Sequence, residues 1–150
     1  MSPETPPPAE PEREPSRPGG HATFGPEAAT ALERTLAELR DPDDALRILH
    51  AIDEAGASFA AYLLLPDTTP AAPDVLDRFY NSYADAWETF AEFRHDVLEA
   101  LGWLEALAKV MNEQGIPEDH ITWNHPVIDR QILDTYDVVH LDGWWHVFNK

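Results

Sequence analysis

Near its C-terminal end the chain reads Tyr136-Asp137-Val138-Val139-His140-Leu141-Asp142-Gly143-Trp144-Trp145-His146-Val147-Phe148. Two segments rich in β-branched and aromatic residues flank the dipeptide Asp142-Gly143. This pattern predicts a β-hairpin with a two-residue type I′ turn, because both turn residues must adopt positive φ. An isolated two-stranded ribbon is only marginally stable in water. The hairpin must therefore pack on helices, gain a third strand or pair with a second copy of the chain.

The register of this hairpin follows from its turn. Leu141 pairs with Trp144 and His140 pairs with Trp145, so His146 falls one position away from His140. The two histidines are therefore not expected to share a metal ion. Trp144 and Trp145 are adjacent on one strand and point to opposite faces. One of them can join the core, and the other must be exposed or covered by a partner, which makes the pair a candidate dimer interface.

Upstream of the hairpin, apolar residues recur at three- and four-residue steps, which indicates amphipathic helices. The expected helices cover residues 27–40, 42–56, 59–65, 74–83, 90–112 and 127–133. Asp41, Ser58 and Thr89 stand at candidate N-cap positions. Thr89 and Glu92 also have the spacing of a capping box. Gly102 is a candidate break in the expected helix 90–112.

The chain divides into a tail and two small units. Residues 1–20 hold seven of the 14 prolines and end in Gly19-Gly20, so we expect a disordered Pro-rich tail over residues 1–25. A small helical domain at 26–84 and a helix plus C-terminal β-hairpin domain at 85–150 are expected to follow. The predicted fold class is α+β, mainly α, with a small helical bundle followed by a short α/β unit that ends in the hairpin.

Composition excludes several classes of protein. The 150 residues include 28 Asp+Glu, 10 Lys+Arg and no Cys, with a formal net charge of −18. The absence of cysteine excludes disulfides, thiolate metal sites and a Cys nucleophile. The negative charge argues against direct binding to nucleic acid or an anionic membrane, since each needs a basic face. No signal-peptide pattern or membrane-length apolar run is present, so a cytoplasmic location is expected.

No catalytic motif is apparent. Nucleophile elbows, phosphate-binding glycine loops and the zinc motif His-Glu-x-x-His are all absent. Glu92-Phe93-Arg94-His95 matches half of the Glu-x-x-His pair of di-iron bundles, but the second copy that such sites need is missing. We therefore expect no enzyme activity, no metal and no cofactor. A metal-dependent enzyme that uses His95 is the remote alternative.

Aromatic residues are concentrated where the fourth and fifth expected helices join. Phe79, Tyr83, Trp87 and Phe93 lie along this join. The expected structure is a small aromatic core that holds the two helices at an angle.

The acidic residues are unevenly distributed. Residues 41–108 contain 14 acidic and three basic residues. Within the expected helix 90–112, Glu92, Asp96 and Glu99 fall on one face, opposite the apolar residues. Like charges at this spacing destabilise a helix, so selection for stability alone would have mixed in lysine. Solubility and adaptation to a salty cytoplasm are alternative explanations of the same composition.

These carboxylates match the pattern of a DNA mimic. Successive acidic side chains on one helix face lie about 5–6 Å apart, which is comparable to the spacing of phosphates along a DNA strand. Asp85 and Glu88 precede the cap, and they join the patch only if that segment folds alongside the helix. Asp77 lies further upstream. An acidic surface of this kind can occupy a DNA-binding groove, with an association that weakens steeply with salt.

The join between the helices also carries a family resemblance. The stretch that carries it is Phe79-Tyr80-Asn81-Ser82-Tyr83-Ala84-Asp85-Ala86-Trp87-Glu88-Thr89-Phe90-Ala91-Glu92-Phe93. It resembles the ArdA antirestriction proteins, in which a Phe is followed at four, eight, ten and fourteen residues by Tyr, an aromatic, Ser and an aromatic. The segment from Asp142 to Phe148 looks like the closing strand of that family. Residues 46–65 are similar to its helical middle domain, so the resemblance covers about 41–150.

The resemblance implies a dimer that mimics duplex DNA and blocks type I restriction–modification enzymes. In this chain the phosphate-mimicking residues would be Asp77, Asp85, Glu88, Glu92, Asp96 and Glu99. The alternative is a non-catalytic helical interaction or scaffold module whose acidity serves only solubility. Its contacts would be apolar, through Trp144 or Trp145 and the edge of the hairpin, and would survive high salt.

Overall fold

A computed structural model describes residues 22–150, and the proline-rich segment predicted to be disordered lies for the most part outside the described residues. Residues 22–150 form seven α-helices, one 3₁₀ turn and a three-stranded sheet, so the fold is α+β and mainly helical. The elements are α1 (Pro26–Glu38), α2 (Pro42–Ala55), α3 (Ala57–Leu63), α4 (Val75–Ser82), β1 (Tyr83–Trp87), α5 (Phe90–Ala100), α6 (Trp103–Gln114), η1 (Glu118–His120), α7 (His125–Thr135), β2 (Tyr136–Leu141) and β3 (Trp144–Asn149).

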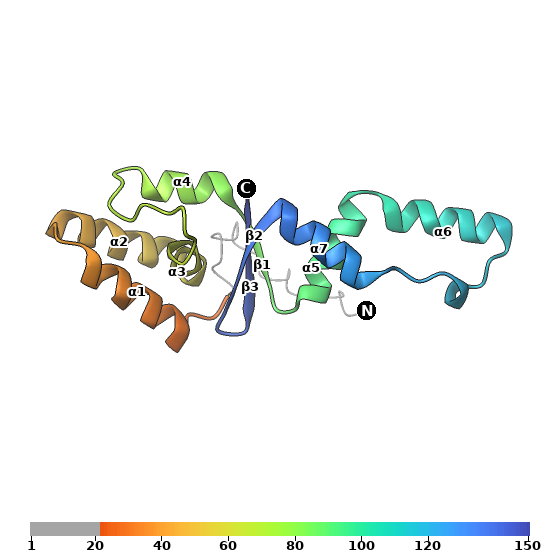
Figure 1. Ribbon diagram of the computed structural model, residues 1–150, viewed down its shortest axis with the longest axis horizontal. Coiled ribbons are helices and arrows are strands. Elements are labelled where there is room, and N and C mark those ends of the chain that lie inside the picture. The colour runs from red at the N-terminus through yellow and green to blue at the C-terminus, as the bar shows by residue number, and fades with distance from the viewer. Residues whose placement is uncertain (1–21) are drawn as a thin grey trace, which may run out of the picture.

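The sheet stands between two groups of helices. Helices α1 to α4 lie on one side, α5 and α7 lie on the other, and α6 projects to the far end of the molecule (Figure 1). The strands are antiparallel in the order β1-β3-β2. The central strand β3 is covered on both faces, because His146, Val147 and Phe148 are all buried although successive side chains point to opposite faces.

The predicted hairpin is confirmed. Asp142 and Gly143 have φ of 49° and 82°, so both turn residues occupy the positive-φ region that a type I′ turn needs. Leu141 pairs with Trp144 and His140 pairs with Trp145, as the turn predicts. The hairpin is supported both by a third strand, β1, and by helices on its two faces.

The third strand replaces the end of an expected helix. We expected the helix that begins near Asp74 to reach Tyr83, but α4 ends at Ser82 and β1 begins at the next residue. Tyr83 pairs with Phe148, whereas Asp85 pairs with Val147, so β1 carries one extra residue at this point. Because of this bulge, the side chains of β1 that follow it point to the opposite faces from those that regular alternation from Tyr83 would give. Pairing with the open edge of β3 therefore overrides the local helical pattern.

The bulge splits the expected aromatic cluster into two. Phe79 and Tyr83, with ring centroids 5.0 Å apart, lie in the core beneath α1–α4. Trp87 and Phe93, with centroids 4.5 Å apart, lie in a second core on the other face of the sheet. The expectation of one aromatic core that joins two helices was wrong, because a strand separates these helices and turns its aromatic side chains to both faces.

Most local signals at the helix ends are confirmed. Asp41 Oδ1 accepts a hydrogen bond from the backbone N–H of Asp43 at 2.9 Å. Gly102, with φ of 76°, separates α5 from α6 at the predicted break. The expected N-cap role of Ser58 was wrong, because α3 already begins at Ala57. The Ser58 side chain is buried instead, with its Oγ 2.8 Å from Nδ1 of His146.

Asp142 connects the hairpin turn to the first helix. Its carboxylate accepts hydrogen bonds from the backbone N–H groups of Gly25, Glu27 and Ala28 at 2.8–2.9 Å. It therefore caps the N-terminus of α1. Burial raises the pKa of Asp142, but the three backbone hydrogen bonds outweigh it and leave this pKa below its ordinary value. A Cβ on Gly25 would lie 2.6 Å from Oδ1 of Asp142, so the contact needs glycine.

The two expected units share the sheet. The expected boundary between residues 84 and 85 lies inside β1. Leu141 and Phe148, from the second expected unit, belong to the core formed by α1–α4. The last residues of the expected tail also contact the hairpin, since Nε1–H of Trp144 donates to Oγ1 of Thr23 at 3.3 Å.

Candidate acidic interaction surface

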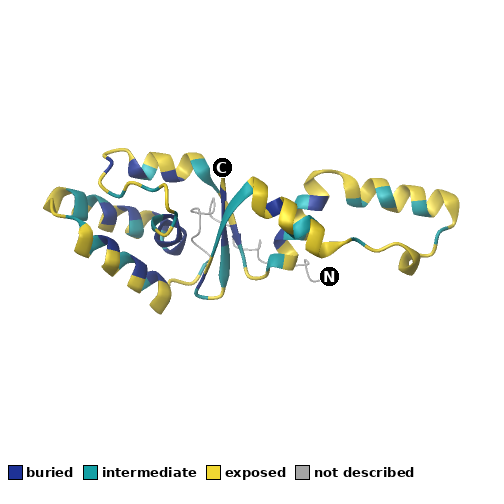
Figure 2. Cartoon of the chain, viewed as in Figure 1, coloured by how far each residue is buried: buried dark blue, intermediate teal, exposed yellow. Residues whose placement is uncertain are grey.

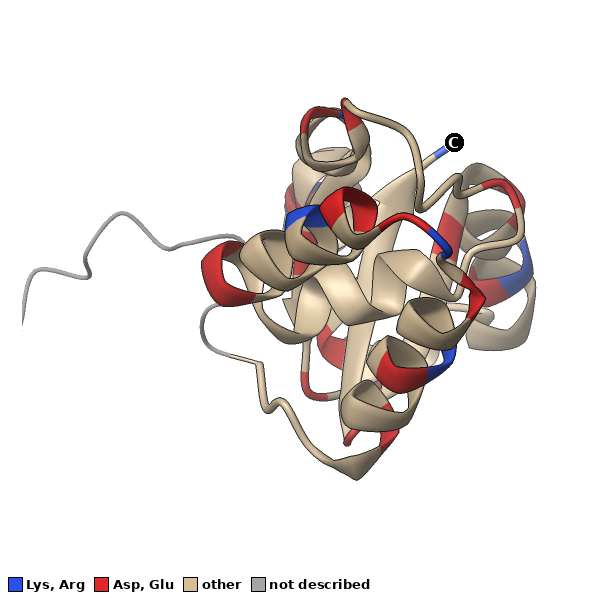
Figure 3. Ribbon diagram, turned by 90° about the vertical axis from the view of Figure 1, so that its left-hand side faces the viewer, with Lys and Arg blue, Asp and Glu red and all other residues tan. Residues whose placement is uncertain are grey.

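Acidic side chains outnumber basic ones on the described surface. Residues 22–150 contain 24 Asp+Glu and eight Lys+Arg. Every one of these carboxylate residues is exposed or half-buried, and none is buried. In Figure 3, which faces the α1–α4 end of the molecule, most of the coloured ribbon segments belong to Asp or Glu and few belong to Lys or Arg. A specific interaction through these carboxylates depends on which of them are held in a fixed arrangement.

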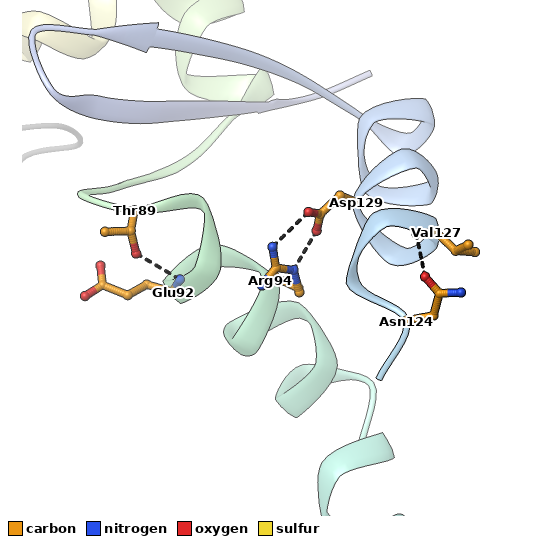
Figure 4. A network of polar contacts seen from close by, with 6 residues as sticks. All are labelled: Thr89, Glu92, Arg94, Asn124, Val127 and Asp129. Atoms are coloured by element: carbon orange, nitrogen blue, oxygen red, sulfur yellow. Dashed lines mark hydrogen bonds and ion pairs between the residues drawn. The ribbon is translucent and has the colours of Figure 1, made fainter. Parts of the chain in front are cut away.

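Helix α5 is fixed at its start and along its inner side. Oγ1 of Thr89 accepts a hydrogen bond from the backbone N–H of Glu92 at 3.1 Å, which confirms the predicted cap (Figure 4). Phe93 and Leu98 are buried on its inner side. The helix position is thus set by a cap and by two core side chains.

An ion pair between α5 and α7 adds a further constraint. The Arg94 guanidinium donates from Nε to Oδ1 and from Nη2 to Oδ2 of Asp129, at 2.6 and 2.8 Å (Figure 4). Both side chains are partly buried. The hydrogen bonds that Arg94 donates to Asp129 raise the pKa of Arg94 despite its burial. The start of α7 is itself capped, because Oδ1 of Asn124 accepts from the backbone N–H of Val127 at 3.4 Å.

The outer side of α5 presents Glu92, Asp96 and Glu99, which we call the α5 acidic face. All three residues are exposed. Their α-carbons are separated along the helix axis by about 6 Å and about 4.5 Å, because each residue rises about 1.5 Å. Among the described residues, no lysine or arginine forms an ion pair with any of them. Glu99 lies 3.8 Å from the His95 ring.

Asp96 is held by a contact that the sequence did not reveal. Nε1–H of Trp87 donates a hydrogen bond to Oδ2 of Asp96 at 2.7 Å. The Trp87 ring is packed on Phe93. No local spacing rule relates a strand residue to a helix residue nine positions later, so only the turn between β1 and α5 could bring these two side chains together.

The other three predicted phosphate-mimicking residues lie in two different parts of the fold. Asp85 and Glu88 are exposed; Asp85 lies within β1, and Glu88 lies in the short segment between β1 and α5. Asp77 is exposed on α4, which packs on the opposite side of the sheet from α5 (Figure 1). Five of the six predicted residues therefore belong to one continuous β1–α5 segment, and Asp77 is separate from it.

Trp144 and Trp145 are both half-buried, so neither is fully exposed or fully in the core. The Trp145 ring lies 5.3 Å from the Phe90 ring and stacks on His140 at 4.2 Å. Trp144 reaches Thr23. Both tryptophans therefore have contacts within the chain, and a dimer interface through them stays a prediction.

Within residues 22–150 no group of three or more His, Asp or Glu side chains is arranged to hold a metal ion. His140 and His146 occupy different register positions on opposite faces of the hairpin. No helix in the described part of the chain is long and apolar enough to cross a membrane.

Comparisons with protein-family models, with curated proteins and with solved structures find no match to this chain.

Proposed function

We propose that this protein is a non-catalytic inhibitor whose carboxylates occupy the DNA-binding groove of an enzyme in place of DNA phosphates. The target class that we propose is the type I restriction–modification enzymes, on the resemblance of the segment around Phe79–Phe93 to ArdA proteins. The α5 acidic face would make the central contact, and Asp85 and Glu88 would extend it.

The observation that carries the proposal is the fixed position of the α5 acidic face. A cap at Thr89, the hydrogen bond from Trp87 to Asp96 and the Arg94–Asp129 ion pair hold the helix and one of its carboxylates. A mimic of a regular phosphate array benefits from such constraint, because less conformational entropy is lost on binding. Carboxylates that served only solubility would not need to be held in a fixed position.

The charge environment supports the same proposal. Because no described lysine or arginine neutralises the α5 acidic face, its potential is available to a basic groove. Complementary charge accelerates association over distances of about a Debye length, about 10 Å at 0.1 M salt. Inhibition that depends on this face should therefore weaken as the salt concentration rises.

The test is inhibition of DNA cleavage by a purified type I restriction–modification enzyme, with the full chain titrated in at two salt concentrations. The variant E92Q/D96N/E99Q removes the three charges, and Asn at position 96 keeps an oxygen acceptor for Trp87. The matched control E33Q/E38Q/D53N removes three exposed charges from α1 and α2. The two variants have the same net charge, so a difference between them reports the position of the charge.

We expect the parent chain to inhibit competitively with DNA and to lose inhibition at high salt. The α5 variant should require at least about tenfold more protein for the same inhibition, and the control variant less than about threefold more. Equal losses in the two variants would mean that only bulk charge matters. An absence of inhibition by the parent chain at large excess would overturn the proposed function.

A further inference from the structure

Helix α6 has no buried residue, and only Leu104, Leu107 and Met111 are half-buried. Every residue of α6 is described. At its start Trp103 is 46% exposed, and further along Val110 is 50% exposed. Figure 2 shows α6 in the colours of exposed and intermediate residues along its length. A helix with an apolar face normally packs that face on a core, so this one is left without a complete cover.

The segment that follows α6 forms a groove with it. This groove has a volume of about 450 Å³ and is lined mainly by Leu104, Leu107, Met111, Ile116, Ile121 and Trp123. Trp123 stacks on Trp103, with ring centroids 6.4 Å apart and an interplanar angle of 12°, which holds the returning segment beside the start of the helix. This volume lies within the range of about 300–1,000 Å³ that is typical of ligand-binding clefts.

Most charged residues in the segment that forms this groove are acidic. Residues 103–123 contain four carboxylates and one lysine. The carboxylates are Glu105, Glu113, Glu118 and Asp119, and all four are exposed, but Glu113 lies on the side of α6 opposite the residues that line the groove. Glu118 also contributes to the wall of the groove. The surface therefore combines an apolar floor with negative charge around it.

This combination distinguishes between possible occupants. A second copy of the same groove would bring a second set of carboxylates against the first, which costs free energy through like-charge repulsion. The segment 1–21 carries four Glu against two Arg and, apart from its prolines, has only Met1 and Ala9 as apolar residues. Neither a second copy nor residues 1–21 supplies the complement of this groove, which is a set of apolar side chains flanked by positive charge.

We propose that the groove between α6 and residues 116–123 binds an amphipathic helix with a basic polar face from a partner protein. The apolar side chains of that helix would enter the groove, and its Lys or Arg residues would face the surrounding carboxylates. Met111 suits such a groove, because its flexible thioether adapts to different apolar partners. This site does not use the α5 acidic face and is independent of the proposed DNA mimicry.

The probe is a fluorescein-labelled synthetic Leu/Lys peptide of about five helical turns, with leucine at positions i, i+3, i+4 and i+7. A control peptide has the same composition, ordered so that no helical face is apolar. Binding to the full chain is measured by anisotropy at about 0.1 M and about 0.5 M NaCl. The test variant is L107N/M111N, and the matched control is L46N/L49N, which changes two exposed apolar residues of α2 without changing charge.

We expect the amphipathic peptide to bind more weakly at about 0.5 M NaCl, by no more than about tenfold, because salt screens the attraction between its lysines and the carboxylates but not the apolar contacts. L107N/M111N should weaken binding at least about tenfold, while L46N/L49N and E92Q/D96N/E99Q should leave it within about twofold. Circular dichroism of each variant checks that helix content is retained.

Three results would overturn the inference. Equal binding of both peptides that disappears at about 0.5 M NaCl would show attraction to bulk charge only. A parent chain that sediments as a dimer, and that L107N/M111N converts to a monomer, would show that a second copy fills the groove. Failure of the amphipathic peptide to bind at concentrations of about 1 mM would also contradict it.

Discussion

Asp142 illustrates how one residue can serve two elements. In the hairpin turn its φ of 49° is a conformation that Asp tolerates better than most residues. Its carboxylate also accepts three backbone hydrogen bonds at the start of α1. The sequence Asp-Gly predicts the first role, but no local signal near Gly25 indicates that a residue from the other end of the chain caps this helix.

We expect D142N to lower the free energy of unfolding by about 1–2 kcal/mol, because Asn tolerates the turn but has only one acceptor oxygen for three N–H groups. Urea denaturation of the full chain measures this loss. D134N is the control, since Asp134 is an exposed carboxylate at the end of α7. A loss in D142N no greater than that in D134N would contradict the capping role.

The stabilisation from Asp142 should depend on pH. Its pKa is lower in the folded chain than in the unfolded chain, so the carboxylate stabilises the fold at pH values above its unfolded pKa of about 3.9. This contribution is lost as the pH falls through the lower, folded pKa. The difference in unfolding free energy between the parent and D142N should thus be constant from pH 7 to about 5 and shrink below about 4. A difference that grew on acidification would exclude this linkage.

At the scale of elements, α5 is the helix whose placement determines the candidate surface. Its cap at Thr89 and its break at Gly102 are local and follow from the sequence. Its attachment to α7 through Arg94 and Asp129 is not local, because residues 35 positions apart must meet. The strand β1 shows the same limit, since its residues became a strand only where β3 offered an edge.

We expect R94Q to lower the free energy of unfolding by about 1–3 kcal/mol, because it leaves the partly buried Asp129 carboxylate without its cation. R94K should restore only part of this loss, since an ammonium group cannot form the two parallel hydrogen bonds that the guanidinium forms. Urea denaturation of the single and double variants with D129N gives the coupling energy. Additive effects of R94Q and D129N would show that the pair contributes nothing as a pair.

At the scale of the whole molecule, negative charge is spread over an elongated arrangement of two helical groups and a sheet (Figures 1 and 3). Only three arginines, at positions 47, 78 and 94, form ion pairs with carboxylates among the described residues. Much of the remaining charge is therefore uncompensated and repels itself in the folded chain.

Salt should consequently stabilise the fold. Raising NaCl from about 0.05 M to about 0.5 M shortens the Debye length and screens this repulsion, so we expect the melting temperature to rise by a few degrees. Scanning calorimetry at constant pH measures the shift. A melting temperature that fell over this range would mean that favourable ion pairs outweigh the repulsion.

The sequence alone determined the features that depend on neighbouring residues: the Asp142-Gly143 turn and its register, the caps at Asp41 and Thr89, and the helix break at Gly102. These follow from dihedral preferences and hydrogen bonds within a few positions, which act in any context. Tertiary structure alone decided that β1 is a strand, which face each aromatic residue occupies and that Asp142 caps α1. Each of these depends on a partner segment far along the chain, and its free energy is gained only when that partner is in place.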